Sequence, residues 1–153
     1  YADYLTGVCA RYISDEDEVK DVLQDSFIKI FTQIHQFEYR GKDSLKAWIT
    51  KVVINEALMY LRQNKTFLVP IVDCLDEEPE MENLGADILF SFIQKLPPGY
   101  RAVFNLFVIE EKSHKEIAEI LQIQPATSAS QFLRARKLLA EMIREYKHQM
   151  ENR

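Results

Sequence analysis

The stretch 112-KSHKEIAEILQIQPATSASQFLRARKLL-139 decides the fold of the second half of the chain. Its apolar residues recur every three or four positions in two runs, before and after 122–124, which predicts two helices joined by a tight turn. Ser113 and Glu116 have the spacing of a capping box, and Pro125 suits the first turn of a helix. The stretch therefore predicts a helix-turn-helix, with helices over 114–121 and from 125 to about 146.

The second of these helices carries side chains that could contact DNA. In a helix-turn-helix the N-terminal half of the second helix enters the major groove. Ser and Gln can pair with base edges there, and Arg or Lys can bind guanine or phosphates. We expect these candidates on the more exposed faces: Thr127, Ser128, Ser130, Gln131, Arg134 and Lys137. A plain helical hairpin would show the same pattern, so spacing alone leaves both readings open.

Charge is unevenly distributed along the 153-residue chain, whose formal net charge is -5. Residues 66–94 hold seven acidic residues and no basic one, whereas residues 95–153 hold ten basic and seven acidic residues. The overall acidity therefore does not argue against DNA binding by the last part. With two prolines and a glycine in 70–87, residues 66–94 are predicted to form an acidic linker. The alternative is an acidic surface loop packed on one domain.

The remaining segments predict helices only. Glycine is scarce, at 4 residues, and no segment alternates apolar and polar residues over the length of a sheet strand. Helices are expected over 1–13, over 14–37 with Ser14 as N-cap, from 44 to about 64, and from Pro98 onward. The helix over 14–37 has an apolar stripe of Val19, Val22, Leu23, Phe27, Ile30, Phe31 and Ile34. The helix after Pro98 is expected to bury Tyr100, Val103, Phe104, Phe107 and Val108. The fold class is therefore all-α, with two small helical domains, 1–65 and 95–153.

Aromatic and basic residues interleave between 37 and 65. This pattern suits single-stranded nucleic acid, because bases stack on aromatic rings and the backbone attracts cations. Trp48 also fits the apolar stripe of its helix, so core packing is the alternative for that residue. Asn55, which follows the apolar run 52–54, is either a satisfied polar residue or a base reader.

Other classes of function find little support. Cys9 and Cys74 lie far apart without a CxxC motif, and the three histidines are scattered, so we expect no metal, no cofactor and no enzymatic activity. Cys9 reads as a small buried residue, with a disulfide to Cys74 as the alternative. No apolar run approaches the roughly 18 residues of a membrane span, so we expect a cytoplasmic protein without membrane insertion. The chain begins at Tyr1, and we expect its natural start to be missing.

The chain resembles bacterial extracytoplasmic-function (ECF, group 4) sigma factors of the sigma-70 family. The region 2 pattern appears as 14-SDEDEVKDVLQDSFIKIF-31 and 44-SLKAWITKVVINEALMYLR-62. The region 4 pattern appears as 96-LPPGYRAVFNLFVIEEKSHKEIAEIL-121 and 127-TSASQFLRARKLL-139. The resemblance implies a specificity factor that binds core RNA polymerase, reads the -10 and -35 promoter elements and aids melting of the -10 region. The alternative is a sigma-like interaction protein that binds an anti-sigma factor or polymerase without reading promoters.

The resemblance also implies residue roles. Residues 1–65 would be region 2, 66–94 the linker and 95–153 region 4. The clamp helices of the largest polymerase subunit would meet Asp21, Gln24, Asp25 and Phe27, with core packing as the alternative for Phe27. A flipped base and the rest of the -10 element would meet Tyr39, Arg40, Lys42, Ser44, Lys46, Trp48, Lys51, Asn55 and Arg62. The six candidates on the last helix would meet the -35 element.

The implied partners are core RNA polymerase (its clamp helices and flap), promoter DNA and an anti-sigma factor. Several positions depart from the family pattern. Gln122 stands where helix-turn-helix units commonly have glycine, Ala126 precedes Thr127 where members often have glycine, Ala129 stands where they often have Lys or Arg, and the run 62–65 is less basic than usual. These departures predict weak DNA binding by the chain alone.

Overall fold

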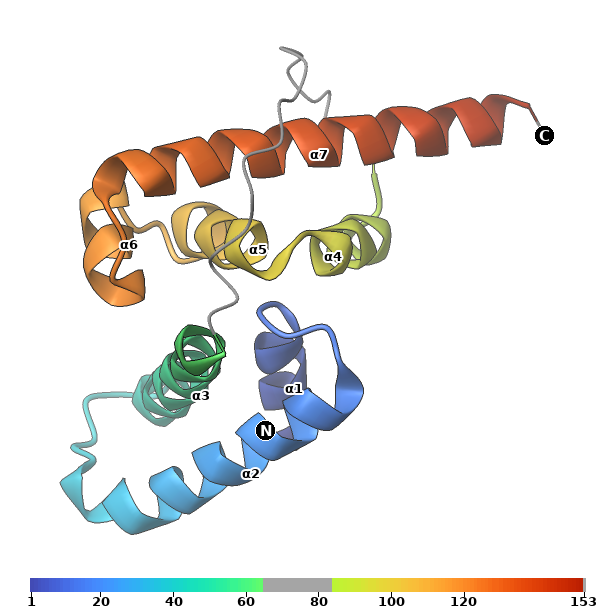
Figure 1. Cartoon of the computed structure of the whole chain (residues 1–153). Helices are drawn as coiled ribbons and strands as arrows, with labels where there is room; N and C mark the ends of the chain where they lie inside the picture. The colour runs from blue at the N-terminus through green and yellow to red at the C-terminus, as the bar shows by residue number, and fades with distance from the viewer. Residues whose placement is uncertain (65–83, 153) are drawn as a thin grey trace. The chain divides into compact units, whose positions relative to one another are not determined.

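The computed structural model describes residues 1–64 and 84–152. The chain divides into two compact units, Tyr1–Lys65 and Thr66–Arg153. Every regular element of the described residues is helical (Figure 1), so the predicted all-α class is confirmed. Each unit has its own core and is described by itself.

The first unit consists of α1 (Ala2–Ala10), α2 (Glu16–Gln33) and α3 (Ser44–Gln63), with a short 3-10 turn at Ile34–Gln36. The three helices pack on one another in all three pairings. Their shared core contains Leu5, Val8, Cys9, Tyr12, Val22, Leu23, Val53, Ala57 and Leu61. The burial predicted for Cys9 is thus confirmed.

The cap of α2 differs by one residue from the sequence expectation. Asp15, not Ser14, is the N-cap, and its carboxylate accepts hydrogen bonds from the backbone N–H groups of Asp17 (2.9 Å) and Glu18 (3.0 Å). A carboxylate at this position also interacts favourably with the helix dipole. Farther along, Lys29 of α2 pairs with the carboxylate of Glu56 on α3. Since Glu56 is only 7% exposed, this pairing offsets the cost of burying its charge.

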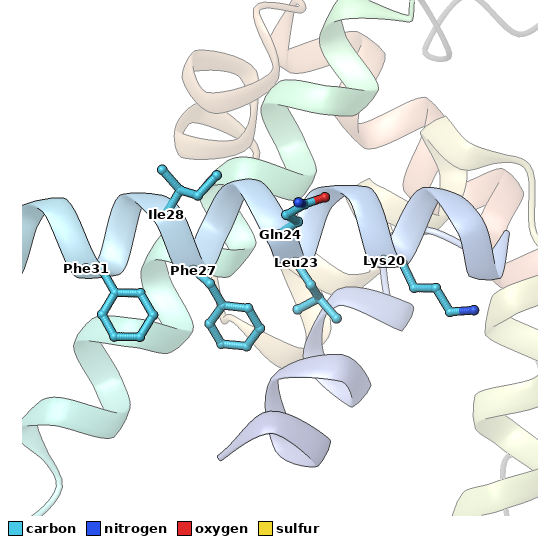
Figure 2. Close-up of a pocket in the computed structure, with 6 residues that line it drawn as sticks. All are labelled: Lys20, Leu23, Gln24, Phe27, Ile28 and Phe31. Atoms are coloured by element: carbon cyan, nitrogen blue, oxygen red, sulfur yellow. The ribbon is translucent and has the colours of Figure 1, made fainter.

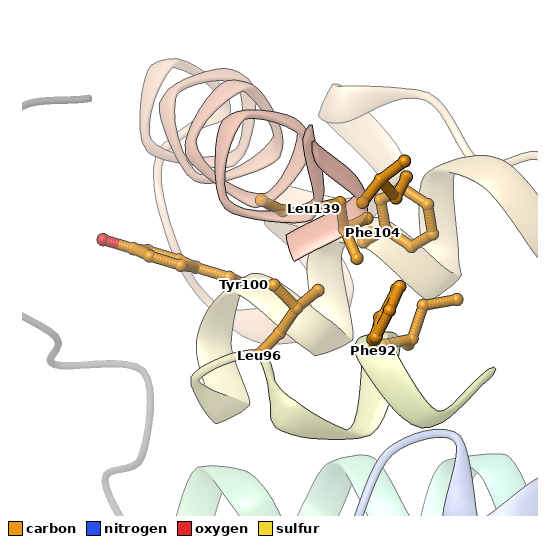
Figure 3. Close-up of a cluster of buried hydrophobic side chains, with 8 residues drawn as sticks. Phe92, Leu96, Tyr100, Phe104 and Leu139 are labelled. Atoms are coloured by element: carbon orange, nitrogen blue, oxygen red, sulfur yellow. The ribbon is translucent and has the colours of Figure 1, made fainter. Parts of the chain in front are cut away.

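The second unit consists of α4 (Ala86–Lys95), α5 (Pro98–Phe104), a π-helical turn (Asn105–Ile109), α6 (His114–Leu121) and α7 (Pro125–Glu151). The long helix α7 runs along the unit and packs on α4, α5 and α6 (Figure 1). Figure 3 shows the core, in which Phe92, Leu96, Tyr100 and Phe104 gather near Leu139 of α7.

Two boundaries of the second unit depart from the sequence expectation. Residues 86–94, assigned to the linker, form most of α4, because Ile88, Leu89, Phe92 and Ile93 recur at helical spacing and pack into the core. The last helix runs to Glu151 rather than to about residue 146. Cys74 and the predicted linker up to residue 83 lie outside the described residues.

The helix-turn-helix itself forms as predicted. The capping box is confirmed: the Glu116 N–H donates to Ser113 Oγ (3.1 Å) and the Ser113 N–H donates to Glu116 Oε1 (3.2 Å). Gln122 ends α6 in the left-handed conformation, with φ 58°. The predicted burial of Val108 is wrong, since its side chain is 45% exposed. The π-helical turn shifts the face of the helix at this point, because its bonds span five residues rather than four.

Candidate nucleic-acid and protein interfaces

One exposed face of α7 carries four of the six predicted DNA contacts. Thr127 and Ser130 are exposed, and Arg134 and Lys137 are half-buried. Their spacing of three and four residues places them on one side of the helix. Leu133, 49% exposed, lies on the Ser130 side of this face. We call Thr127, Ser130, Leu133, Arg134 and Lys137 the α7 face.

Ser128 and Gln131 do not belong to the α7 face. Their side chains are 0% and 4% exposed, so the exposure predicted for them is wrong. The reason is periodicity: positions 128, 131, 135 and 139 follow one another at spacings of three and four, and Ala135 and Leu139 are fully buried. The two polar residues therefore extend the core stripe of α7 toward its N-terminus. Ser128 Oγ lies 2.9 Å from His114 Nδ1 of α6, within hydrogen-bonding distance.

A second stripe of predicted contacts lies along α3. Trp48, Lys51, Asn55 and Arg62 follow one another at spacings of three, four and seven residues and share one side of the helix. Lys51 and Asn55 are exposed, whereas Trp48 and Arg62 are half-buried. Trp48 therefore belongs neither to the deep core nor to open solvent, and Asn55 is not a satisfied core residue.

Lys46 is separated from this stripe. Its ammonium lies over the ring of Tyr4 on α1, with Nζ 4.3 Å from the ring centroid. Tyr4 also lies near Thr50, with the two hydroxyl oxygens 3.3 Å apart. The sequence grouped Lys46 with the other candidate contacts of α3, but the helical turn places it on the side next to α1.

The loop before α3 and the first turns of α3 enclose a pocket of about 420 Å³. Its wall combines two aromatic rings with polar side chains: Gln36, Phe37, Glu38, Arg40, Ser44, Ala47 and Trp48. The rings of Phe37 and Trp48 lie 5.6 Å apart at a tilt of 47°. Arg40 pairs with Glu38 at 3.0 Å, and both are well exposed. Tyr39 and Lys42 are exposed beside the pocket and do not line it.

Local hydrogen bonds set the shape of this loop. Gly41 adopts φ +122°, a conformation that favours glycine. The Ser44 hydroxyl donates to the Gly41 carbonyl (2.8 Å) and accepts from the Arg40 N–H (3.1 Å). Ser44 is thus a loop-shaping residue as well as part of the pocket wall.

The outer face of α2 is apolar and open. Figure 2 shows Lys20, Leu23, Gln24, Phe27, Ile28 and Phe31 along a groove of about 410 Å³. Ile28 is 57% exposed and Phe31 is 76% exposed. Ile34 is 46% exposed, so Phe31 and Ile34 belong to the predicted apolar stripe of this helix but are not buried. We call Phe27, Ile28 and Phe31 the α2 strip. Gln24 lies within this surface, and the exposed carboxylates of Asp21 and Asp25 lie beside it, one turn apart.

The sequence analysis assigned no role to several residues of these surfaces. They include Ile28 and Phe31 of the α2 strip, Gln36 of the pocket wall and Leu133 of the α7 face. For Ile28 and Leu133 a signal was available, because each is an apolar residue one position outside the core stripe of its helix. Such a residue is exposed unless a partner covers it.

Glu116 and Cys9 are two of the titratable groups whose pKa values are shifted. Hydrogen bonds from the backbone and side chain of Ser113 lower the pKa of Glu116, the capping-box residue at the start of α6. Burial raises the pKa of the Cys9 thiol to about 11. Along residues 1–64 and 84–152, no group of three or more His, Cys, Asp or Glu could hold a metal ion. None of the helices in these two ranges is long and apolar enough to cross a membrane.

Comparison with protein families gives matches in both units. The Sigma-70 region 2 family matches residues 1–67, and the Sigma-70, region 4 family matches residues 86–139. The first match contains α1 to α3 with the pocket and the α2 strip. The second begins at α4 and contains the helix-turn-helix with the α7 face. The order of the two matches agrees with the motif order in the chain.

Curated relatives match over nearly the full length. The ECF RNA polymerase sigma-E factor of Haemophilus influenzae is 29% identical over 160 aligned positions, covering 94% of this chain and 83% of the relative. The ECF RNA polymerase sigma factor SigM of Bacillus subtilis is 25% identical, covering 91% of this chain and 90% of the relative.

A solved structure shares the fold. In the co-crystal structure of the sigma factor RpoE with the anti-sigma factor NepR from Bartonella quintana, the sigma factor aligns with a TM-score of 0.55 at 22% identity. The alignment covers 93% of this chain and 91% of that one. With region 2 in its first unit and region 4 in its second, the chain belongs to the sigma-70 family and is an ECF sigma factor.

Proposed function

We propose that this chain directs core RNA polymerase to promoters through three separate surfaces. The α2 strip would bind polymerase, the pocket formed by the loop before α3 and the first turns of α3 would bind the -10 element, and the α7 face would bind the -35 element. The observation that carries the proposal is the position of the α7 face on the second helix of a helix-turn-helix, where Thr127 and Ser130 are exposed and Arg134 is half-buried on the same side.

Readout of the -35 element would use the chemistry of the α7 face. Arg134 can bind guanine through two hydrogen bonds, and Ser130 and Thr127 can pair with base edges or phosphates. Leu133 can contact the methyl group of thymine, as apolar side chains do in the major groove. Lys137 would add a phosphate contact. Ala129, exposed beside this face, contributes no charge, so affinity would depend on the complete holoenzyme.

Readout of the -10 element would centre on the pocket before α3. An unpaired base could enter between the aromatic side of Phe37 and Trp48 and the polar side of Gln36 and Ser44. Stacking on an aromatic ring is worth about 1–3 kcal/mol per base. Lys51, Asn55 and Arg62 follow along α3 and could track the backbone of the same strand, while Tyr39 and Lys42 would contact it beside the pocket mouth.

Polymerase would cover the α2 strip. Phe27, Ile28 and Phe31 offer apolar area, and Gln24, Asp21 and Asp25 offer a polar rim. An apolar centre with a polar border is the usual anatomy of a specific protein interface. The Bartonella quintana sigma factor is in complex with an anti-sigma factor. We propose that this chain also binds a protein of that class.

The test is a promoter selection with reconstituted holoenzyme. Core RNA polymerase and the full chain are incubated with a DNA library randomised over the -35 and -10 regions, and bound fragments are sequenced. We expect two enriched blocks at fixed separation and permanganate-reactive thymines in the -10 block. If the chain binds core polymerase but enriches neither block, the proposal fails and the chain is an interaction protein that does not read promoters.

A further inference from the structure

The joint between α6 and α7 contains a polar contact within an apolar surrounding. His114, the first residue of α6, places Nδ1 2.9 Å from Ser128 Oγ. Ser128 is 0% exposed. The rings of Phe107 and Phe132 pack on His114, so the hydrogen bond gives this part of the joint a directional contact.

The imidazole of His114 also packs against two aromatic rings. Its ring stacks on Phe107 of the π-helical turn at 4.6 Å and 14°, and it lies 5.9 Å from the ring of Phe132 on α7. Phe132 also contacts Phe107 at 4.4 Å. The ring can therefore move little without disturbing three elements, and Nδ1 offers Ser128 a fixed partner.

Ser128 lies in the same helical stretch as the α7 face but points away from it. It follows Thr127 directly and precedes Ser130 by two residues. Because a helix is stiff over one turn, the point where Ser128 is anchored fixes where Thr127 and Ser130 stand. Side chains that read bases must be held within about 0.5 Å of the productive geometry.

We propose that the His114–Ser128 hydrogen bond positions the reading helix, so that both residues are positioning residues for -35 recognition without touching DNA. This inference rests on the proposed function of the α7 face. An apolar helix joint built on small residues such as Ala118 and Ala135 resists separation but tolerates small shifts. A directional hydrogen bond removes that freedom.

Two substitutions of His114 separate the effect of the hydrogen bond from the effect of the ring packing. His114→Phe keeps a ring on Phe107 and removes the nitrogen that meets Ser128. His114→Asn removes the ring and keeps a nitrogen or oxygen at the place of Nδ1. In His114→Phe the Ser128 hydroxyl can turn to the carbonyl of residue 124, four positions back. We therefore expect little change in unfolding stability for this variant.

The readout is the specificity ratio of the reconstituted holoenzyme, measured at one salt concentration. It compares the selected -35 block with a scrambled -35 block, joined to the same -10 block. We expect His114→Phe to lower this ratio about tenfold, comparable to one mismatched base pair. His114→Asn, which keeps the polar contact but loses the ring that holds it in place, should lower the ratio clearly less than His114→Phe does. Ser128→Ala should lower the ratio to the same extent as His114→Phe, and the double variant should lower it no further.

The inference is overturned if His114→Phe and Ser128→Ala both keep the ratio of the unsubstituted chain, or if His114→Asn falls as far as His114→Phe. Should His114→Phe fail to fold, Ser128→Ala, which removes no ring, decides the matter alone. An unsubstituted holoenzyme that does not discriminate between the two -35 blocks would instead overturn the proposed function of the α7 face, and this inference with it.

Discussion

The guanidinium of Arg101 donates a hydrogen bond to the main-chain carbonyl of Leu96, with Nη2 and O 2.6 Å apart. It also donates to the carbonyls of Gln94 (2.7 Å) and Ile93 (3.3 Å). These carbonyls end α4, where a helix leaves its last C=O groups without partners inside the helix. Arg101, which belongs to α5 and is 3% exposed, therefore fixes the end of α4 on α5.

Replacing Arg101 should destabilise the second unit. Arg101→Met keeps much of the side-chain volume but leaves the three carbonyls without these donors in a buried place. We expect a loss of about 3 kcal/mol in the free energy of unfolding, measured by urea denaturation. Lys115→Met, at an exposed position of α6, is the control and should change stability by less than about 0.5 kcal/mol. Equal effects of the two substitutions would contradict the capping role.

Gln122 should be a position where glycine stabilises the protein. Its φ of 58° lies in the left-handed region, which costs a residue with a Cβ about 1–2 kcal/mol relative to the right-handed region. Gln122→Gly should therefore raise the free energy of unfolding by about 1 kcal/mol. Gln122→Ala is the matched control: it removes the side-chain atoms beyond Cβ but keeps the Cβ itself, and should give no gain. A gain in both variants would show that the side chain, not the backbone, carries the strain.

Local signals made the helix-turn-helix predictable. The Ser113 and Glu116 spacing gave the start of α6, and Pro125 gave the start of α7, because caps and first-turn residues act within one turn of the chain. The sequence also showed that Gln122 occupies the turn position where helix-turn-helix units commonly have glycine. The left-handed backbone conformation of Gln122 explains why glycine is common at this position. The start of α4 escaped prediction because its apolar period follows directly on an acidic, proline-containing segment.

The faces of the helices were harder to predict than their ends. Ser128 and Ser130 are the same residue type two positions apart, yet one is buried and the other exposed. Residue type cannot separate them, whereas the spacing of Ser128 from the buried Ala135 and Leu139 along α7 can. Phe31 has the spacing of a core residue, but its side chain is 76% exposed. Sequence periodicity shows that a face is apolar and does not say whether the same chain covers it.

Stability should fall at alkaline pH through Cys9. Burial raises the pKa of this thiol from 9.0 to about 11, so the folded state keeps its proton longer than the unfolded state. The contribution is fully present below pH 9.0 and is lost as the pH rises to about 11, with a total on the order of 2 kcal/mol. The measurement compares the pH dependence of the free energy of unfolding between the unsubstituted chain and Cys9→Ala. If the free energies of unfolding of the two proteins change in parallel between pH 9.0 and about pH 11, the pKa of Cys9 is not raised by folding.

The α2 strip predicts a substitution that separates folding from partner binding. Phe31→Ser replaces a side chain that is 76% exposed, so the free energy of unfolding should change by less than about 0.5 kcal/mol. If polymerase covers the strip, affinity for core RNA polymerase should weaken by about 2 kcal/mol, the loss typical of a buried aromatic anchor. Fluorescence titration of core enzyme with labelled chain measures this. Tyr1→Ser, which removes another exposed aromatic ring of the same unit (69% exposed), should bind as the unsubstituted chain does.

Arg134 and Arg136 offer the sharpest test of the α7 face, since they are two residues apart and carry the same charge. Arg134 belongs to the face, whereas the guanidinium of Arg136 lies over the ring of Phe132, 5.8 Å from its centroid. Arg134→Ala should weaken binding of the holoenzyme to the selected -35 block by about 1–3 kcal/mol and relax specificity at one base position. Arg136→Ala removes the same charge and should leave base specificity unchanged, although a general loss of electrostatic attraction can weaken binding to every sequence alike. Competition binding against single-base variants of the -35 block separates the two effects. If Arg136→Ala relaxes specificity and Arg134→Ala does not, the side of α7 that contacts DNA is not the α7 face.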